Sequence, residues 1–254
     1  MAGIFITKRM TVAIPASGIP YTVGPDGNIV LGAMTLDVHF DVSPTWLELA
    51  LEHLAVAKRR EGERNAAWTG SDEDLKASTL EREFEASMQA IVAAAIAIDA
   101  FYSSVRKKAE VPEELVTTWR QNRTSRPVQV AEVLRIAFGL AGSGFDALRE
   151  NLQEIYRYRD LATHPSGDIK PAILDSELGV GVEWRFQYFR HANADLAVKT
   201  TMRILSELAT FGKPKNEAVH LYAEMLRQRL EQMGIVTRQV DDEPADASAE
   251  QRQA

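Results

Sequence analysis

Apolar and polar side chains alternate over much of the first forty residues, as is typical of β-structure. In the segment 34–42 every second residue is apolar, which predicts a strand with one buried face. Upstream, a Pro-Asp-Gly sequence at positions 25–27 separates two β-prone runs, 21–23 and 29–31. Turn formers between two such runs predict a hairpin or a small meander.

Beyond residue 43 the apolar residues recur every three or four positions, as in amphipathic helices. Ser43 followed by Pro44 indicates a helix start, because a capping hydroxyl precedes a proline in the first turn. The polar run 59–70 predicts a connection between two helices. A second start signal at 71–74 introduces what is expected to be the longest helix, with apolar positions continuing to Val105.

The rest of the chain predicts further helices and one strand. Segment 113–126 fits neither pattern, and between Val182 and Tyr188 large apolar residues alternate with polar ones, which predicts a strand. Pro165 disfavours helical geometry at His164, so a helix is expected to end there. The remaining helices are expected at about 128–140, 145–164, 194–211 and 216–233.

These elements predict a mainly α fold. It is expected to be a helical bundle with an N-terminal β hairpin or meander and an additional strand near 182–189. Three parts are expected along the chain: a β-rich segment at 1–43, a helical domain at 44–234, and an acidic tail at 235–254. The tail has too few apolar residues to order itself by burial, so it is expected to be disordered.

Composition narrows the classes of function. The 254 residues include no cysteine, which excludes disulfides and thiolate chemistry and suits a cytoplasmic protein. The N-terminus lacks the order of a secretory signal, and the apolar stretch 88–102 is shorter than the ~20 residues that span a bilayer. No membrane association is expected. A net charge of -7 argues against coating nucleic acid by bulk electrostatics, although a local basic site is allowed.

One segment carries candidate chemistry, Arg159-Asp160-Leu161-Ala162-Thr163-His164-Pro165, at the end of the predicted helix 145–164. The spacing of arginine and histidine is weak by itself. The context strengthens the signal, because a polar residue follows the arginine and a helix break follows the histidine. The alternative interpretation is that Arg159 is a surface arginine and that His164 caps the last carbonyls of its helix.

In this context the segment resembles the motif of HEPN domains, in which arginine, a polar residue, three further residues and histidine run into a helix break. The resemblance extends over about 74–211 and implies a HEPN-like helical bundle. Active HEPN domains form dimers and cleave RNA without a metal. The resemblance therefore implies a homodimer with Arg159 and His164 as catalytic residues, an RNA substrate, and a toxin or phage-defence effector.

Two partner classes follow from the resemblance: RNA as substrate, and an antitoxin or defence partner protein. Some relatives are not nucleases, so the alternative is a non-catalytic HEPN-like protein that dimerises or binds a partner through the same surface. The β segments lie outside the simple helical bundle and leave the subfamily open.

The chemistry of an RNA cleavage site suits these two side chains. Attack by a ribose 2′-hydroxyl on the adjacent phosphate needs a group that moves protons near pH 7, which histidine provides. A planar, permanently charged guanidinium suits the phosphoryl oxygens. On an ideal helix, five residues separate Arg159 from His164 by about 7.5 Å of rise and roughly 140° of rotation. Either the last turn distorts, or two chains contribute to one cleft.

Two acidic residues are candidates for supporting roles. Asp99 lies within an apolar helix and needs a partner if it is buried, so it either pairs with Arg159 or points to solvent. The resemblance adds that the upstream HEPN helix often carries an acidic residue at this place. Asp160 either orients Arg159 or His164, or is simply solvated.

Candidate RNA contacts lie nearby. Arg120, Arg123 and Arg126 form a basic run that would guide RNA, with Trp119 available for base stacking, or would be a solvated loop. Tyr158 is a candidate contact with RNA or a partner chain, whereas Tyr156 keeps step with core positions.

No metal site and no cofactor are expected. The other histidines, His39, His53, His191 and His220, show no spacing that recommends a metal. The sequence also lacks a Walker phosphate loop and a nucleophile-elbow serine.

Overall fold

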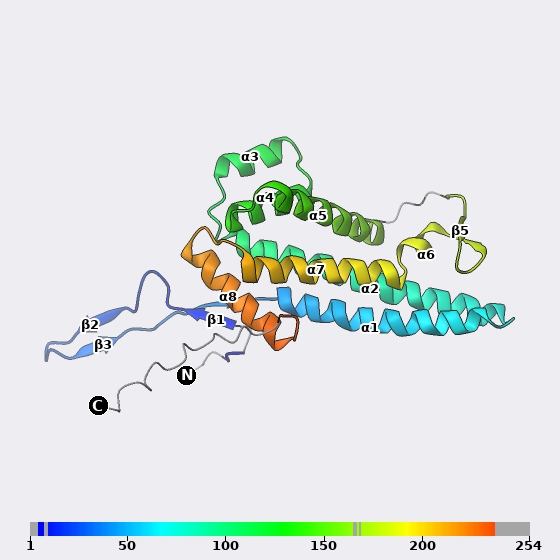
Figure 1. Ribbon diagram of the computed structural model, residues 1–254. Helices are drawn as coiled ribbons and strands as arrows, with labels where there is room; N and C mark the ends of the chain where they lie inside the picture. The colour runs from blue at the N-terminus through cyan, green and yellow to red at the C-terminus, as the bar shows by residue number, and fades with distance from the viewer. Residues whose placement is uncertain (1–4, 8–9, 165–166, 168, 237–254) are drawn as a thin grey trace, which may run out of the picture.

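The computed structural model describes residues 5–7, 10–164, 167 and 169–236. The part of the chain that it describes is mainly helical, with eight helices and three small two-stranded sheets (Figure 1). The helices are α1 (Ser43–Trp68), α2 (Glu73–Arg106), α3 (Glu113–Gln121), α4 (Arg126–Phe138), α5 (Gly142–Thr163), α6 (Trp184–Tyr188), α7 (His191–Phe211) and α8 (Glu217–Gln232). The strands are β1 (Met10–Ala13), β2 (Tyr21–Val23), β3 (Ile29–Leu31), β4 (Asp37–Phe40), β5 (Ile173–Asp175) and β6 (Val180–Val182).

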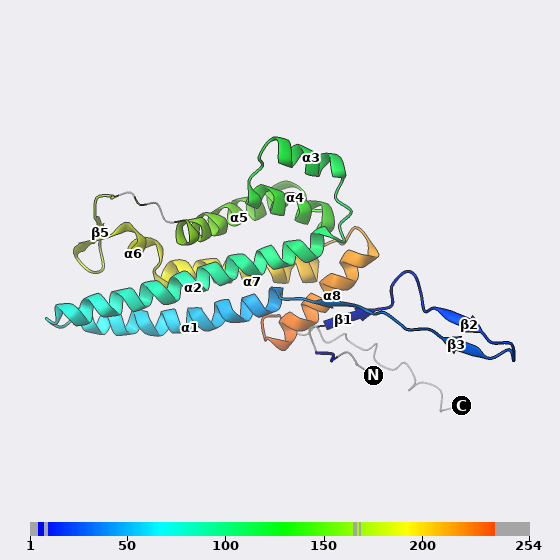
Figure 2. The same cartoon turned by 180° about the vertical axis from the view of Figure 1, so that it is seen from behind.

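Helices α1 and α2 form a long antiparallel hairpin that runs the length of the body (Figure 2). The start of α2 agrees with its signal, because the Asp72 side chain accepts from the Leu75 N–H at 3.0 Å. At α1 the cap is different from the expected one: Ser43 is the first helical residue, and the Asp41 carboxylate accepts from both its N–H and its hydroxyl at 2.9 Å.

The sequence predicted a connection at the polar run 59–70, and this prediction is wrong. Most of the run is the last part of α1. Ion pairs between neighbouring turns satisfy its charges within the helix: Lys58 pairs with Glu61 at 2.8 Å, and Arg60 pairs with Glu63 at 2.6 Å. Arg64 is buried against α2. A polar sequence therefore remains helical because its charges pair locally or with the next helix.

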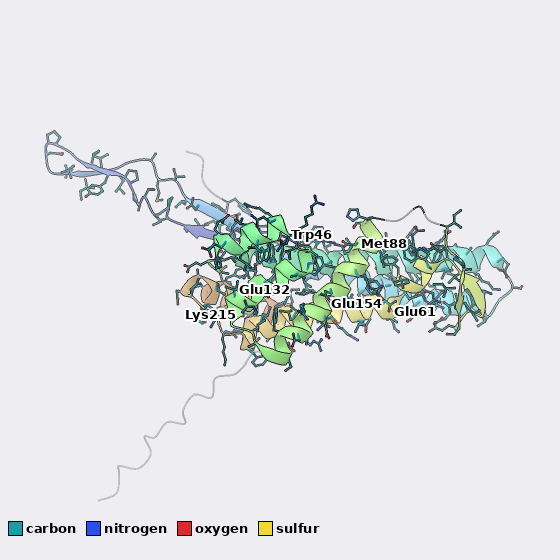
Figure 3. All side chains as sticks on the ribbon, turned by 90° about the horizontal axis from the view of Figure 1, so that it is seen from above. Trp46, Glu61, Met88, Glu132, Glu154 and Lys215 are labelled. Carbon is teal, nitrogen blue, oxygen red and sulfur yellow. The ribbon has the colours of Figure 1, made fainter. Side chains whose placement is uncertain are left out.

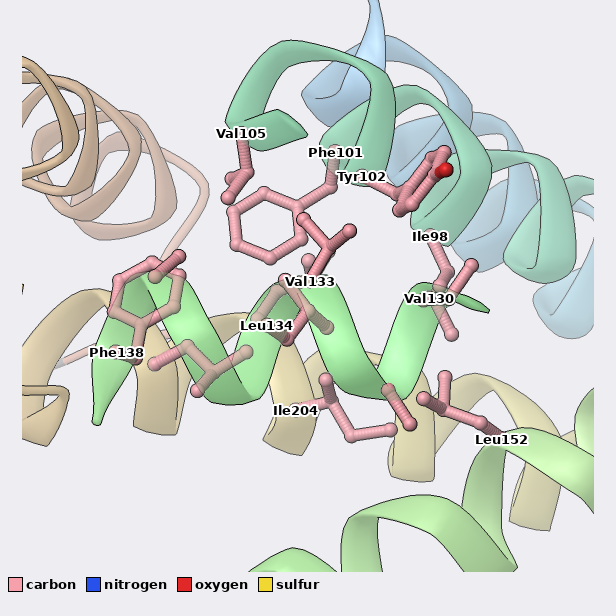
Figure 4. Close-up of a cluster of buried hydrophobic side chains, with 14 of the residues drawn as sticks. Ile98, Phe101, Tyr102, Val105, Val130, Val133, Leu134, Phe138, Leu152 and Ile204 are labelled. Carbon is pink, nitrogen blue, oxygen red and sulfur yellow. The ribbon is translucent and has the colours of Figure 1, made fainter. Parts of the chain in front are cut away.

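The core lies where α2 meets α4, α5, α7 and α8. In Figure 4, Phe101 of α2 points toward Val133 and Leu134 of α4, and the rings of Phe101 and Phe138 stack with their centroids 6.1 Å apart. Small residues of α2, such as Ala94, pack with Ala194 and Val198 of α7, which lets these two helices approach closely. Length and hydropathy alone would allow α2 to cross a bilayer, but 61% of its most apolar window is buried in the protein, as in a core helix.

The prediction of a strand near 182–189 is wrong for most of these residues. Only Val182 belongs to a strand, β6, and the aromatic residues after it form the short helix α6. The Glu183 side chain caps this helix by accepting from the Arg185 N–H at 2.8 Å. In the helix, Trp184 and Tyr188 lie one turn apart with ring centroids at 5.6 Å, a contact that a strand would not make.

A buried ion network fixes the β5–β6 hairpin to the helical hairpin. Arg64 and Glu83 form an ion pair in which each side chain is 1% exposed. Arg190 pairs with Asp175 of β5 and lies 3.4 Å from Glu83. The Glu83 carboxylate also accepts the backbone N–H of His191 at 3.0 Å. The network therefore joins α1, α2, β5 and the start of α7.

The N-terminal strands form two separate two-stranded sheets. β1 pairs with β4, and β2 pairs with β3 across the Pro-Asp-Gly turn, as the hairpin prediction requires. The strand expected at 34–42 is shorter, because β4 covers only Asp37–Phe40, and all four of its residues are exposed. The β2–β3 hairpin extends away from the helices as an arm (Figures 1 and 3). The expected disordered tail lies almost entirely outside the described residues.

Candidate functional site

Helix α5 ends where the sequence predicts. Thr163 is its last residue, and the His164 N–H closes the final turn by donating to the Asp160 carbonyl at 2.9 Å. The backbone of His164 leaves helical geometry, with φ at -127° and ψ at 62°. Its side chain is exposed, while Pro165 lies outside the described residues. His164 is therefore an accessible imidazole at a helix end.

Asp99, on the α2 surface that faces α4 and α5, gathers three donors. Its carboxylate accepts from Arg126 Nε at 2.7 Å, from the Tyr156 hydroxyl at 2.8 Å and from Arg159 Nη1 at 3.0 Å. The expected pairing of Asp99 with Arg159 is therefore found. We call Asp99, Arg126, Tyr156 and Arg159 the Asp99 cluster.

Arg159 is held on more than one side. Besides Asp99, its guanidinium donates to Asp160 through Nε at 3.0 Å and through Nη2 at 2.8 Å. It also stacks over the Tyr156 ring, with its central carbon 4.6 Å from the centroid. The Arg159 side chain is 22% exposed. Asp160 thus orients Arg159, which is one of the roles that the sequence suggested for it.

The electrostatics of the cluster fix the protonation states of Arg126 and Tyr156. Burial would lower the pKa of Arg126, but the hydrogen bond and the attraction from Asp99 outweigh it and raise the pKa. Burial and the neighbouring Asp99 charge raise the pKa of Tyr156 far above its ordinary value. Tyr156 therefore stays a neutral hydroxyl donor, and Arg126 stays a cation.

A surface hollow of about 620 Å³ opens beside the cluster. It lies between the start of α4 and the last turns of α5. Its lining includes Arg126, Tyr156, Arg157, Asp160 and His164. Among the described residues, Arg159 is not part of this lining and has no hydrogen bond to His164. One chain thus places Arg159 at the Asp99 cluster and His164 at the neighbouring hollow, without a contact between the two side chains.

The lining of the hollow also contains Arg157, a cation that the sequence places beside the proposed cleft, and three residues that the sequence did not single out, Ser125, Pro127 and Gln153. Helical spacing was the available signal, because residues 153, 157, 160 and 164 recur at steps of three or four and share one face of α5. Arg157 forms an ion pair with Glu154, and the hydrogen bond with Glu154 raises the pKa of Arg157. It therefore contributes a permanent cation at the edge of the hollow.

The other members of the basic run lie apart from this site. Arg120 is 73% exposed and 3.8 Å from Glu113, and Arg123 is exposed after the end of α3. Only Arg126 reaches the Asp99 cluster. Trp119 is 6% exposed and packs in the core, so the prediction that it is available for base stacking is wrong.

Tyr158 lies against other aromatic side chains. Its ring is 5.9 Å from that of Tyr188 and 6.4 Å from that of Phe189. Burial raises the pKa of its hydroxyl. In this chain Tyr158 helps α5 pack on the segment before α7, and among the described residues it is not part of the hollow's lining.

Metal ligands do not gather in the described part of the chain: it contains no group of three or more histidine, aspartate and glutamate side chains arranged to hold an ion. Comparison of the chain with protein-family models, with curated proteins and with solved structures finds no match.

Proposed function

We propose that this protein is a metal-independent endoribonuclease of the HEPN type, with Arg159 and His164 as its catalytic residues. The observation that carries the proposal is the hollow at the end of α5, where an exposed histidine lies with two arginines, Arg126 and Arg157. A concave surface with an imidazole and guanidinium groups suits a phosphodiester, which needs charge compensation and proton transfer together.

The proposed reaction is attack by the ribose 2′-hydroxyl on the adjacent phosphorus. The hydroxyl loses its proton, the bond from phosphorus to the 5′-oxygen breaks, and that oxygen takes up a proton. The products are a 2′,3′-cyclic phosphate and a 5′-hydroxyl. His164 would move one of these protons, and Arg159 would stabilise the charge on the phosphoryl oxygens.

The proposed cleft is shared by two chains. Within one chain, Arg159 donates to Asp99 and Asp160, whereas His164 lines the neighbouring hollow. A second copy that covers the end of α5 would bring its own Arg159 toward this hollow. The arrangement supports a homodimer in which the fixed Arg159 of one copy faces His164 of the other, with Asp99 and Asp160 as positioning residues. RNA would approach over Arg126, with Arg120, Arg123 and Tyr158 at the margin.

As a toxin or phage-defence effector in the cytoplasm, such a nuclease would need control by an antitoxin or another defence partner protein. A partner that covers the hollow would block access of RNA to His164. This part of the proposal rests on the resemblance of the Arg159 to His164 segment.

The experiment is incubation of the purified protein with a total RNA pool in the presence of EDTA. We expect cleavage at an unchanged rate with and without EDTA, and fragments that carry cyclic phosphate and 5′-hydroxyl ends. Absence of cleavage by the dimeric protein, or cleavage that EDTA abolishes, would overturn the proposal.

One observation favours a second function. The Arg159 guanidinium donates to the carboxylates of Asp99 and Asp160 and stacks on the Tyr156 ring. Such contacts also suit a structural arginine in a non-catalytic HEPN-like protein that dimerises or binds a partner. That function predicts that Arg159→Ala changes the solution mass or the affinity for a partner, while RNA assays show no cleavage by the unsubstituted protein.

A further inference from the structure

Three arginines lie at or beside the hollow, and they differ in what their guanidinium groups already bind. Each of the three nitrogens of Arg159 donates to a carboxylate, Nη1 to Asp99 and both Nε and Nη2 to Asp160. In Arg157, Nε and Nη2 donate to one neighbouring carboxylate. In Arg126 only Nε has a hydrogen-bond partner within the described part of the chain. Both terminal nitrogens of Arg126 therefore remain available to a ligand.

The Arg126 guanidinium is held in place while its terminal nitrogens stay uncovered. Its Nε donates to Asp99 at 2.7 Å, and its central carbon lies 4.1 Å from the centroid of the Tyr102 ring. Tyr102 is 1% exposed, and the Asp99 carboxylate also accepts from Tyr156, so both supports are themselves held. The Arg126 side chain is 35% exposed and lines the hollow. An oriented guanidinium is thus fixed at the wall of the hollow.

The terminal N–H groups of a guanidinium match two oxygens of one phosphate, because the planar fork makes two parallel hydrogen bonds. Since the Arg126 guanidinium is already oriented, little side-chain entropy is lost when a phosphate binds. Ser125 at the start of α4 also lines the hollow, and the N-terminus of a helix favours a negative charge. His164 lines the same hollow, so one chain holds both a phosphate ligand and the proposed proton-transfer group.

The balance of charge around the hollow favours a ligand with a single negative charge. The three arginines are matched by three carboxylates, those of Asp99, Glu154 and Asp160. Binding at Arg126 therefore depends on its own hydrogen bonds and not on a broad positive field. A phosphodiester carries one negative charge and suits this setting better than a terminal phosphate, which carries about 1.5 to 2.

We infer that Arg126 binds a phosphodiester of the RNA in the hollow of the chain that supplies His164, without a contribution from the second chain. The inference rests on the proposed function and deepens it. Arg126 holds the substrate before the reaction, whereas Arg159 of the other copy stabilises the charge that develops during it. Asp99 and Tyr102 are the positioning residues of Arg126.

The test is the affinity of the whole protein for a short fluorescein-labelled 2′-O-methyl RNA, measured by fluorescence anisotropy at several salt concentrations. The methyl group blocks the attacking hydroxyl, so the probe binds without being cleaved. Arg126→Gln is expected to weaken binding by about 10-fold or more, because a charged hydrogen-bonding pair is lost. The slope of log affinity against log salt is expected to fall by about 0.7, the contribution of one phosphate contact on a single strand.

Two further variants separate phosphate binding from a structural role of Arg126. Arg126→Lys keeps a cation beside Asp99 and loses the planar fork, so it is expected to keep the salt slope and lose part of the affinity. The matched control is Arg82→Gln, which removes an exposed cation of α2 outside the lining of the hollow. It is expected to leave affinity and slope unchanged. Circular dichroism checks that each variant is folded.

Cleavage kinetics distinguish failure of this inference from failure of the proposed function. On unmodified RNA, Arg126→Lys is expected to raise KM with a smaller change in kcat, as for a residue that binds substrate and transition state alike. Binding of the probe through Arg126 by a protein that cleaves no RNA would overturn the proposed function alone. Cleavage of RNA with an unchanged affinity and salt slope for Arg126→Gln would overturn this inference alone, as would failure of the unsubstituted protein to bind the probe.

Discussion

Replacing Glu83 with alanine is expected to lower the free energy of unfolding by about 3–5 kcal/mol, because it leaves a buried arginine without its main counter-charge. Glu83 and Arg64 are each 1% exposed. Glu83 also accepts the His191 N–H and lies beside Arg190. The substitution therefore removes the acceptor that joins α1, α2 and the start of α7. Chemical denaturation followed by far-ultraviolet circular dichroism measures the change.

Two controls separate this effect from general sensitivity to charge changes. Asp195→Ala breaks an exposed pair with Lys199, whose side chain is 66% exposed, and is expected to cost less than about 1 kcal/mol. Replacing both partners of the buried pair, Arg64→Met with Glu83→Leu, is expected to recover much of the loss, because no isolated charge remains. A change below about 1 kcal/mol for Glu83→Ala would contradict the role of the network.

His164→Ala is expected to reduce the rate of RNA cleavage by about 10²–10⁴-fold, the contribution of one proton-transfer group. The fold is expected to persist, because the His164 side chain is exposed and the helix is closed by its backbone N–H. The free energy of unfolding is therefore expected to change by no more than about 0.5 kcal/mol. Initial rates on a defined RNA, with EDTA present, measure the loss.

The matched control is His220→Ala on α8, whose side chain is 51% exposed and pairs with Glu224 outside the site. It is expected to cleave RNA at the unsubstituted rate. Equal rates for the two histidine variants would remove His164 from the proposed chemistry. A loss of cleavage that accompanies unfolding of the His164 variant would point instead to a structural role.

The fold could be predicted from sequence where local signals are strong. Pro165 predicts the end of α5 at His164, and Pro-Asp-Gly at 25–27 predicts the β2–β3 turn, because both restrict the backbone by themselves. The segments 59–68 and 184–188 were interpreted wrongly for a common reason. Their structure depends on local ion pairs and a local cap and on partners in other elements, Glu83 for Arg64 and Phe84 for Phe186, which periodicity alone does not reveal.

The candidate site was predictable in part. Asp99 is the single carboxylate in the apolar second half of α2, and a buried carboxylate needs a partner, which predicted the contact between Asp99 and Arg159. The helix α4 that brings Arg126 to the same carboxylate follows a break in the pattern, so its approach to Asp99 depends on tertiary packing. The hollow itself arises from the spacing of α4 and α5, which sequence does not specify.

The shared cleft is the central claim, and mixing two inactive variants tests it most directly. Arg159→Ala and His164→Ala are each expected to be inactive alone. If each site takes Arg159 from one chain and His164 from the other, a mixed dimer retains one complete site. Random exchange of subunits in a symmetric dimer would then restore roughly a quarter of the unsubstituted activity.

The measurement is the initial rate of RNA cleavage by the mixture, after subunit exchange and with EDTA present. Recovery of activity in the mixture, with neither variant active by itself, is the predicted result. A mixture that stays inactive although mass measurements show mixed dimers would contradict the shared cleft, because sites contained within single chains have no complete copy in that dimer.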